Sequence, residues 1–526
     1  MRKGQRKKPQ AKRAPSMNGT AGRAMLEKAA AQIALDTINS IKNSGYISSN
    51  TGYGNYGANT SSSSLRGWIY TGGSHREDIE DNINILRQRS RDEFMGVPLA
   101  TGAIKTMRTN IVGTGLKLHS VINHRILNMT PEAAAELQRN IEDEFALWAE
   151  SKDCDLQRLD DFYELQQLAF LSWLQSGDVV ALLPTTKRVN QPYNLRINLI
   201  EADRVETPPH LMGRPDIVEG VETNQSGEVV AYHIANHHPL GRWYVAPTWQ
   251  RVEAYGKRTG RRNVLHVMTR ERVVQVRGVP FLAPVIRELK NLGRYTDAEL
   301  MAAVISGLYA IFIEKEAESN EIPFATVEDM QDSGTPAGAN EIKMKSGSII
   351  DLAPGEHANV VQPGRPNANF AGFVEAMSKH IGAALEIPQE LLLKQFSSSY
   401  SASRGALLEF WKVVNMYRKW LSMDFCQPIF EEWLAEAVSI GRINAPGFFD
   451  DPLKRKAYSG AEWHAPSNGQ LNPLVEAQAV EKLIDIGLTT RQAAAAEMNG
   501  SNYADNVARL KIENELLREA NGDAEY

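Results

Sequence analysis

Residues 283–311 read APVIRELKNLGRYTDAELMAAVISGLYAI, and this stretch decides the fold. Its large apolar residues recur every three or four positions, which is typical of one side of an amphipathic helix. They are Val285, Leu289, Leu292, Met301, Val304, Ile305 and Leu308. The spacing predicts one long helix of about eight turns over the whole stretch.

A second apolar stripe follows at residues 370–387, before Pro388. Its members recur at helical spacing and are Phe370, Phe373, Val374, Met377, Ile381 and Leu385. The residues in between, 312–369, are rich in acidic residues, Gly and Pro, and their one strand-like run is GSIIDLAPG. The sequence therefore predicts an antiparallel helix pair that carries a small β module at its tip.

The chain downstream of this pair is predicted to be helical. A serine-rich loop at residues 394–403 precedes another long helix, which is marked by large apolar residues at helical spacing. They are Leu407, Leu408, Trp411, Val414, Tyr417 and Leu421. Residues 473–518 predict two or three more helices, with Gly487 and Gly500 as stops.

Upstream of the helix pair, the sequence pattern changes from helical to strand-like at about residue 178. Residues 178–276 contain short alternating runs separated by turn residues, with NQSG at 224–227 as a hairpin turn. Helical patterns precede this block over residues 78–112, which Pro98 divides, and over residues 131–148 and 161–175. The expected fold class is therefore α+β.

Composition places the chain among ordinary soluble proteins. Its 526 residues are 42% hydrophobic and 23% charged, and this length exceeds what one core usually supports. Cys154 and Cys426 lie far apart, without the spacing of a disulfide framework or a zinc site. No signal peptide and no run of about 18 apolar residues is found. We expect a soluble protein of a reducing compartment, without metal or cofactor.

Positive charge is concentrated at the start of the chain. The net charge is −5, yet eight Lys and Arg precede Glu27. Residues 43–64 are mainly Gly, Ser, Asn and Tyr, which predicts a flexible arm over residues 1–74. A formal G-x-G-x-x-G within it has no preceding strand, so a dinucleotide site is not expected. A basic arm can bind nucleic acid, although a solvated tail is the simpler interpretation.

Catalytic patterns are weak. His237 and His238 have no metal-ligand partner at helical spacing, and Asp161 stands where a carboxylate caps a helix. His233 and His266 lie in strand-like runs and are interpreted as structural. No Walker loop or G-x-S-x-G elbow is present. A hydrolase that uses His237, His238 or Asp161 is thus a distant hypothesis.

Four segments, in order, resemble the lambda-type portal protein family of tailed phages. They are MGVPLATGAIKTMRTNIVGTGLKLHS (95–120), RVVQVRGVPFLAPVIRELKNLGRYTDAELMAA (272–303), GSIIDLAPGE (347–356) and IGAALEIPQELLLKQFSSSYSASRGALLEFWK (381–412). The chain departs from the family pattern in two places. Glu386 stands where the family usually has Gly, and the Gln-x-Arg-Gly motif that begins at Gln275 is kept only in the form QVRG.

The resemblance implies a portal fold assembled as a ring, usually of twelve subunits. Its regions map onto this sequence as a flexible N-terminal arm (1–74), a wing (75–282, with a long helix and connection at 404–464), an outward stem helix (283–311), a clip (312–369), a return stem helix (370–387), a tunnel loop (388–403) and a helical crown (465–526).

Two sets of residues are implied as functional. The tunnel loop would face DNA through Lys394, Gln395, Phe396, Ser397, Ser398, Ser399, Tyr400, Ser401 and Arg404. The clip would dock partners through Glu314, Glu316, Glu318 and Glu321. A flexible linker and a solvated acidic loop are the simpler interpretations of these two sets.

The implied function is a head–tail connector at one capsid vertex of the virion, made in the host cytoplasm. Its channel would pass double-stranded DNA of any sequence during packaging, retention and ejection. Twelve copies would carry about −60 (12 × −5), which disfavours tight phosphate binding. Implied partners are the terminase, head-completion or neck proteins, and capsid and scaffolding proteins, without a membrane. The alternative is a non-viral nucleic-acid-binding protein that uses the basic arm and Tyr46, Tyr53 and Tyr56.

Overall fold

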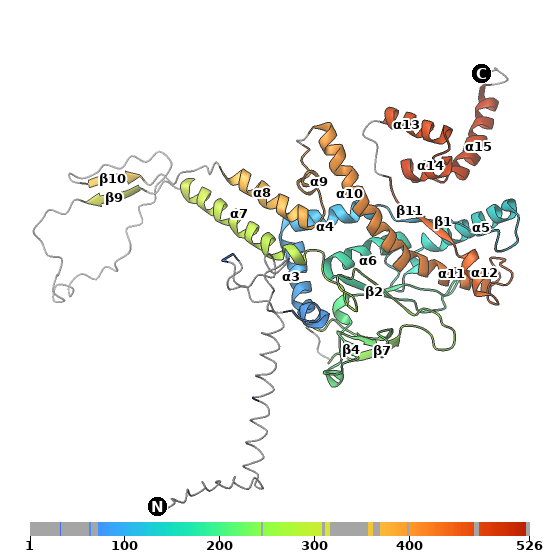
Figure 1. Ribbon diagram of the computed structural model, residues 1–526, viewed down its shortest axis with the longest axis horizontal. Helices are drawn as coiled ribbons and strands as arrows, with labels where there is room; N and C mark the ends of the chain where they lie inside the picture. Colours follow the sequence, from blue (N-terminus) through green and yellow to red (C-terminus); the bar gives the residue numbers. More distant parts are fainter. Residues whose placement is uncertain are drawn as a thin grey trace, which may run out of the picture. The chain divides into compact units, whose positions relative to one another are not determined.

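The computed structural model describes residues 32, 63–64, 72–242, 246–307, 311–315, 356–360, 369–396, 399–467 and 473–521. The chain divides into two units, Met1–Gly72 and Gly73–Tyr526, and every element below belongs to the second (Figure 1). Most of the predicted N-terminal arm lies outside the described residues.

Local sequence signals set the ends of the first helices. After the short helix α2 (His75–Asp78), α3 (Ile83–Gly96) and α4 (Pro98–Ile111) are separated at Pro98, as predicted. Helix α5 (Pro131–Ala149) is capped by the hydroxyl of Thr130. Helix α6 (Phe162–Ser176) begins at Asp161, whose carboxylate accepts from two backbone N–H groups, and it ends at Gly177 with φ of 91°. The capping interpretation of Asp161 is confirmed.

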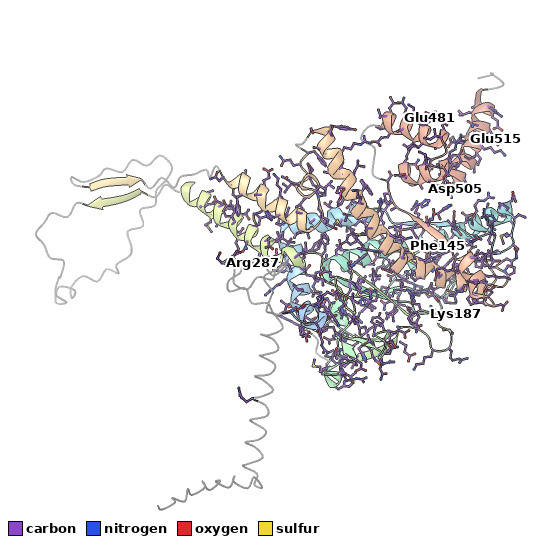
Figure 2. All side chains as sticks on the ribbon, in the orientation of Figure 1. Phe145, Lys187, Arg287, Glu481, Asp505 and Glu515 are labelled. Atoms are coloured by element: carbon purple, nitrogen blue, oxygen red, sulfur yellow. The ribbon has the colours of Figure 1, made fainter. Side chains whose placement is uncertain are left out.

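Aromatic side chains join distant helices at the centre of the core. The long helix α10 (Tyr400–Leu421) continues through a π-helical turn (Ser422–Cys426) into α11 (Gln427–Ser439). The buried ring of Phe145 on α5, labelled in Figure 2, lies 5.1 Å from Trp433 and 5.7 Å from Phe430 of α11, both edge-to-face. These contacts hold α11 against α5 although almost 300 residues separate them in sequence.

The β block forms two antiparallel sheets. The first has the order β3-β2-β8, from Asn198–Ile200, Asp178–Leu182 and Val264–Met268. The second has the order β4-β5-β6-β7, from Ile217–Val218, Val221–Thr223, Val229–Ala235 and Trp249–Glu253. The NQSG turn joins β5 to β6, as predicted. Elsewhere β1 (Lys117–Ser120) pairs with β11 (Ala461–His464), which follows α12 (Pro452–Tyr458).

A buried charge cluster ties the β block to the helices. The Asp178 carboxylate on β2 accepts from Arg87 Nη2 of α3 at 3.0 Å and from Arg277 Nε at 2.7 Å. His266 Nε2 of β8 lies 3.2 Å away, and all four side chains are buried or nearly so. Burial alone would raise the pKa of Asp178, but the two guanidinium groups hold it well below its ordinary value. Burial, then the charge of Arg277, lowers the pKa of Arg87 to about 10.

The segment QVRG completes this cluster from the loop before α7. Gln275 is buried, and its amide oxygen accepts from the backbone N–H groups of Glu271 and Arg272. Its amide nitrogen donates to the Arg277 carbonyl at 2.6 Å. Gly278 packs directly on Gly177, where a Cβ atom has no room, and its N–H donates to Asp178. The start of α7 is therefore fixed to the sheet.

The predicted helix pair is present with shorter bounds. Helix α7 covers Ile286–Gly307 after a 3-10 turn (Ala283–Val285), and α8 covers Phe370–Ala384. Tyr295 of α7 contacts the rings of Phe370 and Phe373 of α8. The prediction that α7 reaches Ile311 is wrong, because β9 (Ile311–Lys315), rich in β-branched and aromatic residues, begins there.

A two-stranded antiparallel sheet does occur between the two helices. Strand β9 pairs with β10 (Glu356–Val360), so that Ile311 lies opposite Val360. The run GSIIDLAPG lies outside the described residues.

The C-terminal part is helical, as predicted. Helices α13 (Pro473–Asp485), α14 (Arg491–Asn499) and α15 (Tyr503–Asn521) follow one another, and Gly500 ends α14 in a left-handed conformation. Among residues 473–520, Ala494 alone is buried. Among the described helices, none has the length and apolar character that crossing a bilayer requires.

We expect the buried charge cluster around Asp178 to contribute strongly to the stability of the folded subunit. Asp178→Asn leaves two buried guanidinium groups without a carboxylate, and we expect it to lower the free energy of unfolding by about 3–5 kcal/mol. Urea denaturation followed by circular dichroism, at fixed protein concentration, measures the change. The matched control is Asp216→Asn, which breaks an exposed pair with Arg214 and should leave the midpoint unchanged. An equal response of both variants would contradict the structural role given to Asp178.

Candidate functional site

The candidate site is the connection between α8 and α10, residues 385–399. Its first part is a tight turn in which Ile387 N donates to the Gly382 carbonyl at 2.9 Å. A Cβ atom at Gly382 would lie 2.7 Å from the Ile387 carbonyl oxygen, so the close approach requires glycine. Leu385 and Ile387 are both buried and anchor the turn in the core. The connection therefore leaves α8 from a fixed point.

Glu386, between these two anchors, has a left-handed backbone with φ of 55°. Its side chain is exposed. Residues with a Cβ atom adopt this conformation at a cost of about 1–2 kcal/mol, whereas glycine does so freely. The position at which the sequence departs from the family's usual Gly is thus a position where the fold favours Gly.

A short helix, α9 (Gln389–Leu393), follows Pro388. It contacts α4 and α8, and Leu392 is buried. Lys394 ends α9 in a left-handed conformation, and its N–H donates to the Glu390 carbonyl. The predicted tunnel loop, 388–403, therefore contains a helical turn that sequence reasoning missed, because the run LLL has neither a capping residue nor a clear period.

The second part of the connection is shaped by the start of α10. The Ser399 hydroxyl accepts from Ala402 N, so α10 begins at Tyr400. The sequence had predicted that this helix begins at residue 404. Tyr400 and Ser401 belong to its first turn, and both are exposed. Arg404 Nη1 donates to the Tyr400 hydroxyl at 3.4 Å and lies 3.9 Å from Glu476 of α13.

The structure thus separates the predicted tunnel-loop residues into groups. Lys394, Gln395 and Phe396 form one exposed stretch, with 61% of the Phe396 surface accessible. Lys394 makes no ion pair with any other residue that the structure describes. The hydroxyl of Ser399 is engaged as a cap, and Arg404 faces α13. Ser397 and Ser398 lie outside the described residues.

An open groove of about 420 Å³ lies beside this connection. Residues from α8, the turn and α10 line it, namely Lys379, Gly382, Ala383, Glu386, Ile387, Pro388, Gln389, Glu409, Phe410 and Val413. The sequence could not predict the groove, because its walls come from helices that meet only in the fold.

Of the four acidic residues predicted for docking in the clip, the structure describes one. Glu314 belongs to β9, and Glu316, Glu318 and Glu321 lie outside the described residues. The histidines behave as structural groups where the structure describes them: His233 Nε2 lies 3.1 Å from Glu222, and His266 joins Asp178. Across the same described residues, no cluster of three or more His, Cys, Asp or Glu has the arrangement of a metal site.

Comparison with known proteins identifies one family. Residues 61–418 match the family described as phage portal protein, lambda family. The portal protein of Escherichia phage N15 is 23% identical over 478 residues, which cover 87% of this chain and 89% of that protein. Portal protein B of Escherichia phage lambda is 22% identical over 475 residues, which cover 87% and 88%.

Solved structures of gene transfer agent particles are also similar. A chain from the neck of an empty particle, computed with C6 symmetry, is 14% identical, with 79% of this chain and 92% of that chain covered and a TM-score of 0.42. A chain from the neck of a native particle, computed with C12 symmetry, is 14% identical, with 80% and 94% covered and a TM-score of 0.40.

The backbone at Glu386 can be tested directly. Glu386→Gly should raise the free energy of unfolding by about 1 kcal/mol, because glycine removes the cost of the left-handed conformation. Glu386→Ala is the matched control, since it removes the charge but keeps the Cβ atom. Thermal denaturation of the three proteins measures the differences. A gain with Ala as large as the gain with Gly would show that the side chain, not the backbone, carries the cost.

Proposed function

The chain belongs to the lambda family of phage portal proteins, which are structural components of the virion and not enzymes, and on this premise we propose that it assembles into a ring with an axial DNA channel. The family match over residues 61–418 carries the proposal, because it includes the helix pair, the connection after it and most of α10. It also decides between the two functions that the sequence left open, in favour of the portal.

The helix pair supports assembly on physical grounds. The first half of α7 packs against the rest of the subunit, because its Leu289 and Leu292 side chains are buried. Its second half exposes Leu300, Met301 and Val304, with 67% of Leu300 accessible, and α8 exposes Phe373. Apolar surface gathered on one part of a helix is costly in water and marks a contact surface. We assign it to packing between stem helices of neighbouring copies.

In this ring, of twelve copies by the family's usual number, the exposed stretch Lys394–Phe396 would border the channel. Phe396 and Tyr400 offer apolar contacts that do not depend on DNA sequence, and Lys394 offers one phosphate contact per copy. The net charge of −5 per copy opposes tight retention of DNA. Such a channel would let DNA of any sequence slide.

We assign the segment around β9 and β10 to docking. A separate terminase motor would bind it during packaging, and head-completion or neck proteins would bind afterwards; Glu314, Glu316, Glu318 and Glu321 are the candidate contacts. Capsid and scaffolding proteins would surround the ring at one vertex of the capsid.

Electron microscopy of the purified full chain in negative stain, with native mass measurement, tests the proposal. We expect rings of about a dozen copies with an open axial channel. Only monomers or small oligomers, under conditions that preserve assembly, would contradict it.

A variant of the helix pair should block assembly without unfolding the subunit. Leu300→Glu with Val304→Glu places two charges on the exposed apolar face of α7, and we expect loss of most rings with an unchanged circular dichroism spectrum. Asn291→Glu with Ala298→Glu is the matched control, since it adds the same charges on the opposite, exposed face. Intact rings in the first variant would remove this face of α7 from the interface.

A further inference from the structure

One histidine connects helices α14 and α15 to the strand β1. The ring of His119 on β1 faces the side-chain amides of Gln492 on α14 and of Asn502, just before α15. Gln492 Nε2 lies 3.5 Å from His119 Nε2, and Asn502 Nδ2 lies 3.2 Å from His119 Nδ1. Between residues 491–521 and the described part of residues 72–467, these are the hydrogen-bonding contacts that the structure contains. The protonation state of this ring therefore acts directly on the contact.

Both amide groups are held with their nitrogen atoms toward the ring. Gln492 Oε1 accepts from the backbone N–H of Tyr503 at 3.0 Å. Asn502 Oδ1 accepts from the backbone N–H of Ala504 at 2.9 Å and so caps the start of α15. Turning either amide over would break this bond and set an NH2 group against an N–H group. His119 is therefore faced by two hydrogen-bond donors.

The histidine ring can accept from these donors only when it is neutral. A neutral ring has a lone pair at one nitrogen, so either Nε2 accepts from Gln492 or Nδ1 accepts from Asn502. A protonated ring carries a hydrogen at both nitrogens and accepts from neither amide. Protonation of His119 thus removes the hydrogen bond that the ring makes to the C-terminal helices.

Charged groups around the ring set where it titrates. The Glu142 carboxylate of α5 lies 3.1 Å from His119 Nδ1, and this hydrogen bond raises the pKa of His119 above its ordinary value although burial opposes the shift. Glu462 of β11 and Asp505 of α15, the latter labelled in Figure 2, attract the proton more weakly. His464 lies 5.1 Å away between ring centroids, and burial, then the charge of His119, lowers its pKa. Within this cluster, His119 is therefore the group that titrates near neutral pH.

The sign of the pH effect follows from what docking does to the ring. Docking of α14 and α15 places two donors against His119 and excludes water from it, and both effects favour the neutral form. Asp505 acts in the opposite direction, with a smaller effect than burial. Lys117, two residues before His119 on β1, is exposed to water. The docked state thus binds fewer protons than the undocked state, and it gains stability as the pH rises through the titration of His119.

We propose that His119 is a pH-sensitive latch between β1 and helices α14 and α15, closed when the ring is neutral and opened when it is protonated. The latch lies within one subunit and does not depend on the proposed ring of copies. Acidification would loosen the C-terminal helices and leave the buried cluster around Asp178 intact, because that carboxylate keeps its charge far below neutral pH.

Hydrogen exchange of the full chain, followed by mass spectrometry and corrected for the intrinsic effect of pH on exchange, tests the latch. From about pH 9 to about pH 6, we expect the protection of residues 491–505 to fall about two- to tenfold, the range for one hydrogen bond. Helix α6 should keep its protection. His119→Gln removes the titrating ring and should abolish the change. His464→Gln is the matched control, since it removes the neighbouring histidine and should leave the change in place.

Asn502→Asp tests the same contact by exchanging a donor for an acceptor. The carboxylate keeps one oxygen for the Ala504 N–H and turns the other toward the ring, so that protonated His119 can donate to it. We expect the pH dependence to change sign, with greater protection of residues 491–505 at about pH 6 than at about pH 9. Asn506→Asp is the control: it adds the same charge to α15, but its side chain contacts Ser501, and the wild-type direction should remain.

The outcomes separate this inference from the proposed function. An equal fall in protection in the wild type and in His119→Gln would overturn the latch, because another group would then carry the pH dependence. Constant protection in the wild type, or an Asn502→Asp variant that keeps the wild-type direction, would overturn it as well. Rings seen by microscopy without a pH response would leave the portal assignment intact. A pH response in a protein that forms no rings would support the latch and contradict the proposed ring.

Discussion

The buried carboxylate of Asp178 is the interaction on which the arrangement of this subunit depends. Two guanidinium groups from distant parts of the chain, Arg87 on α3 and Arg277 before α7, meet on it in the interior. A buried charge without its partners is strongly destabilising, so each of these segments must occupy one position relative to the first sheet. The direction in which α7 leaves the body follows, because Gly278 and Gln275 fix the backbone just before it.

This fixed start gives α7 two different halves. Leu289 and Leu292, near the start of the helix, are buried. Leu300, Met301 and Val304, further along it, are exposed, although apolar residues recur at helical spacing in both halves. Helix α15 also leaves large apolar side chains exposed, among them Leu510, Ile512 and Leu516. The exposed apolar surface of α7 is the surface that the proposed ring would bury.

Local chemistry made much of the fold predictable. Pro98, Asp161, Gly177 and the NQSG turn act within a few residues, and each ended or began an element where expected. The charge cluster could not be predicted, because Arg87 and Arg277 lie 91 and 99 residues from Asp178. At the candidate site the resemblance marked Glu386 as a departure, but only the backbone shows why glycine suits that position. The cap of α10 by Ser399 was likewise not predictable, because a serine-rich run offers several equivalent hydroxyls and only the backbone shows which one accepts from the first turn.

The caps on either side of the candidate loop also limit how it can move. Lys394 closes α9 and Ser399 opens α10, and the five Cα–Cα steps from one to the other can span at most about 18 Å. A larger displacement of Phe396 must unwind the first turn of α10 or detach α9. The cap by Ser399 contributes about 1 kcal/mol, whereas detaching α9 exposes the buried side chain of Leu392 at a cost of about 2 kcal/mol. The loop therefore adapts more readily from its α10 side, where Tyr400 and Ser401 stand, than from the side that is anchored in the core.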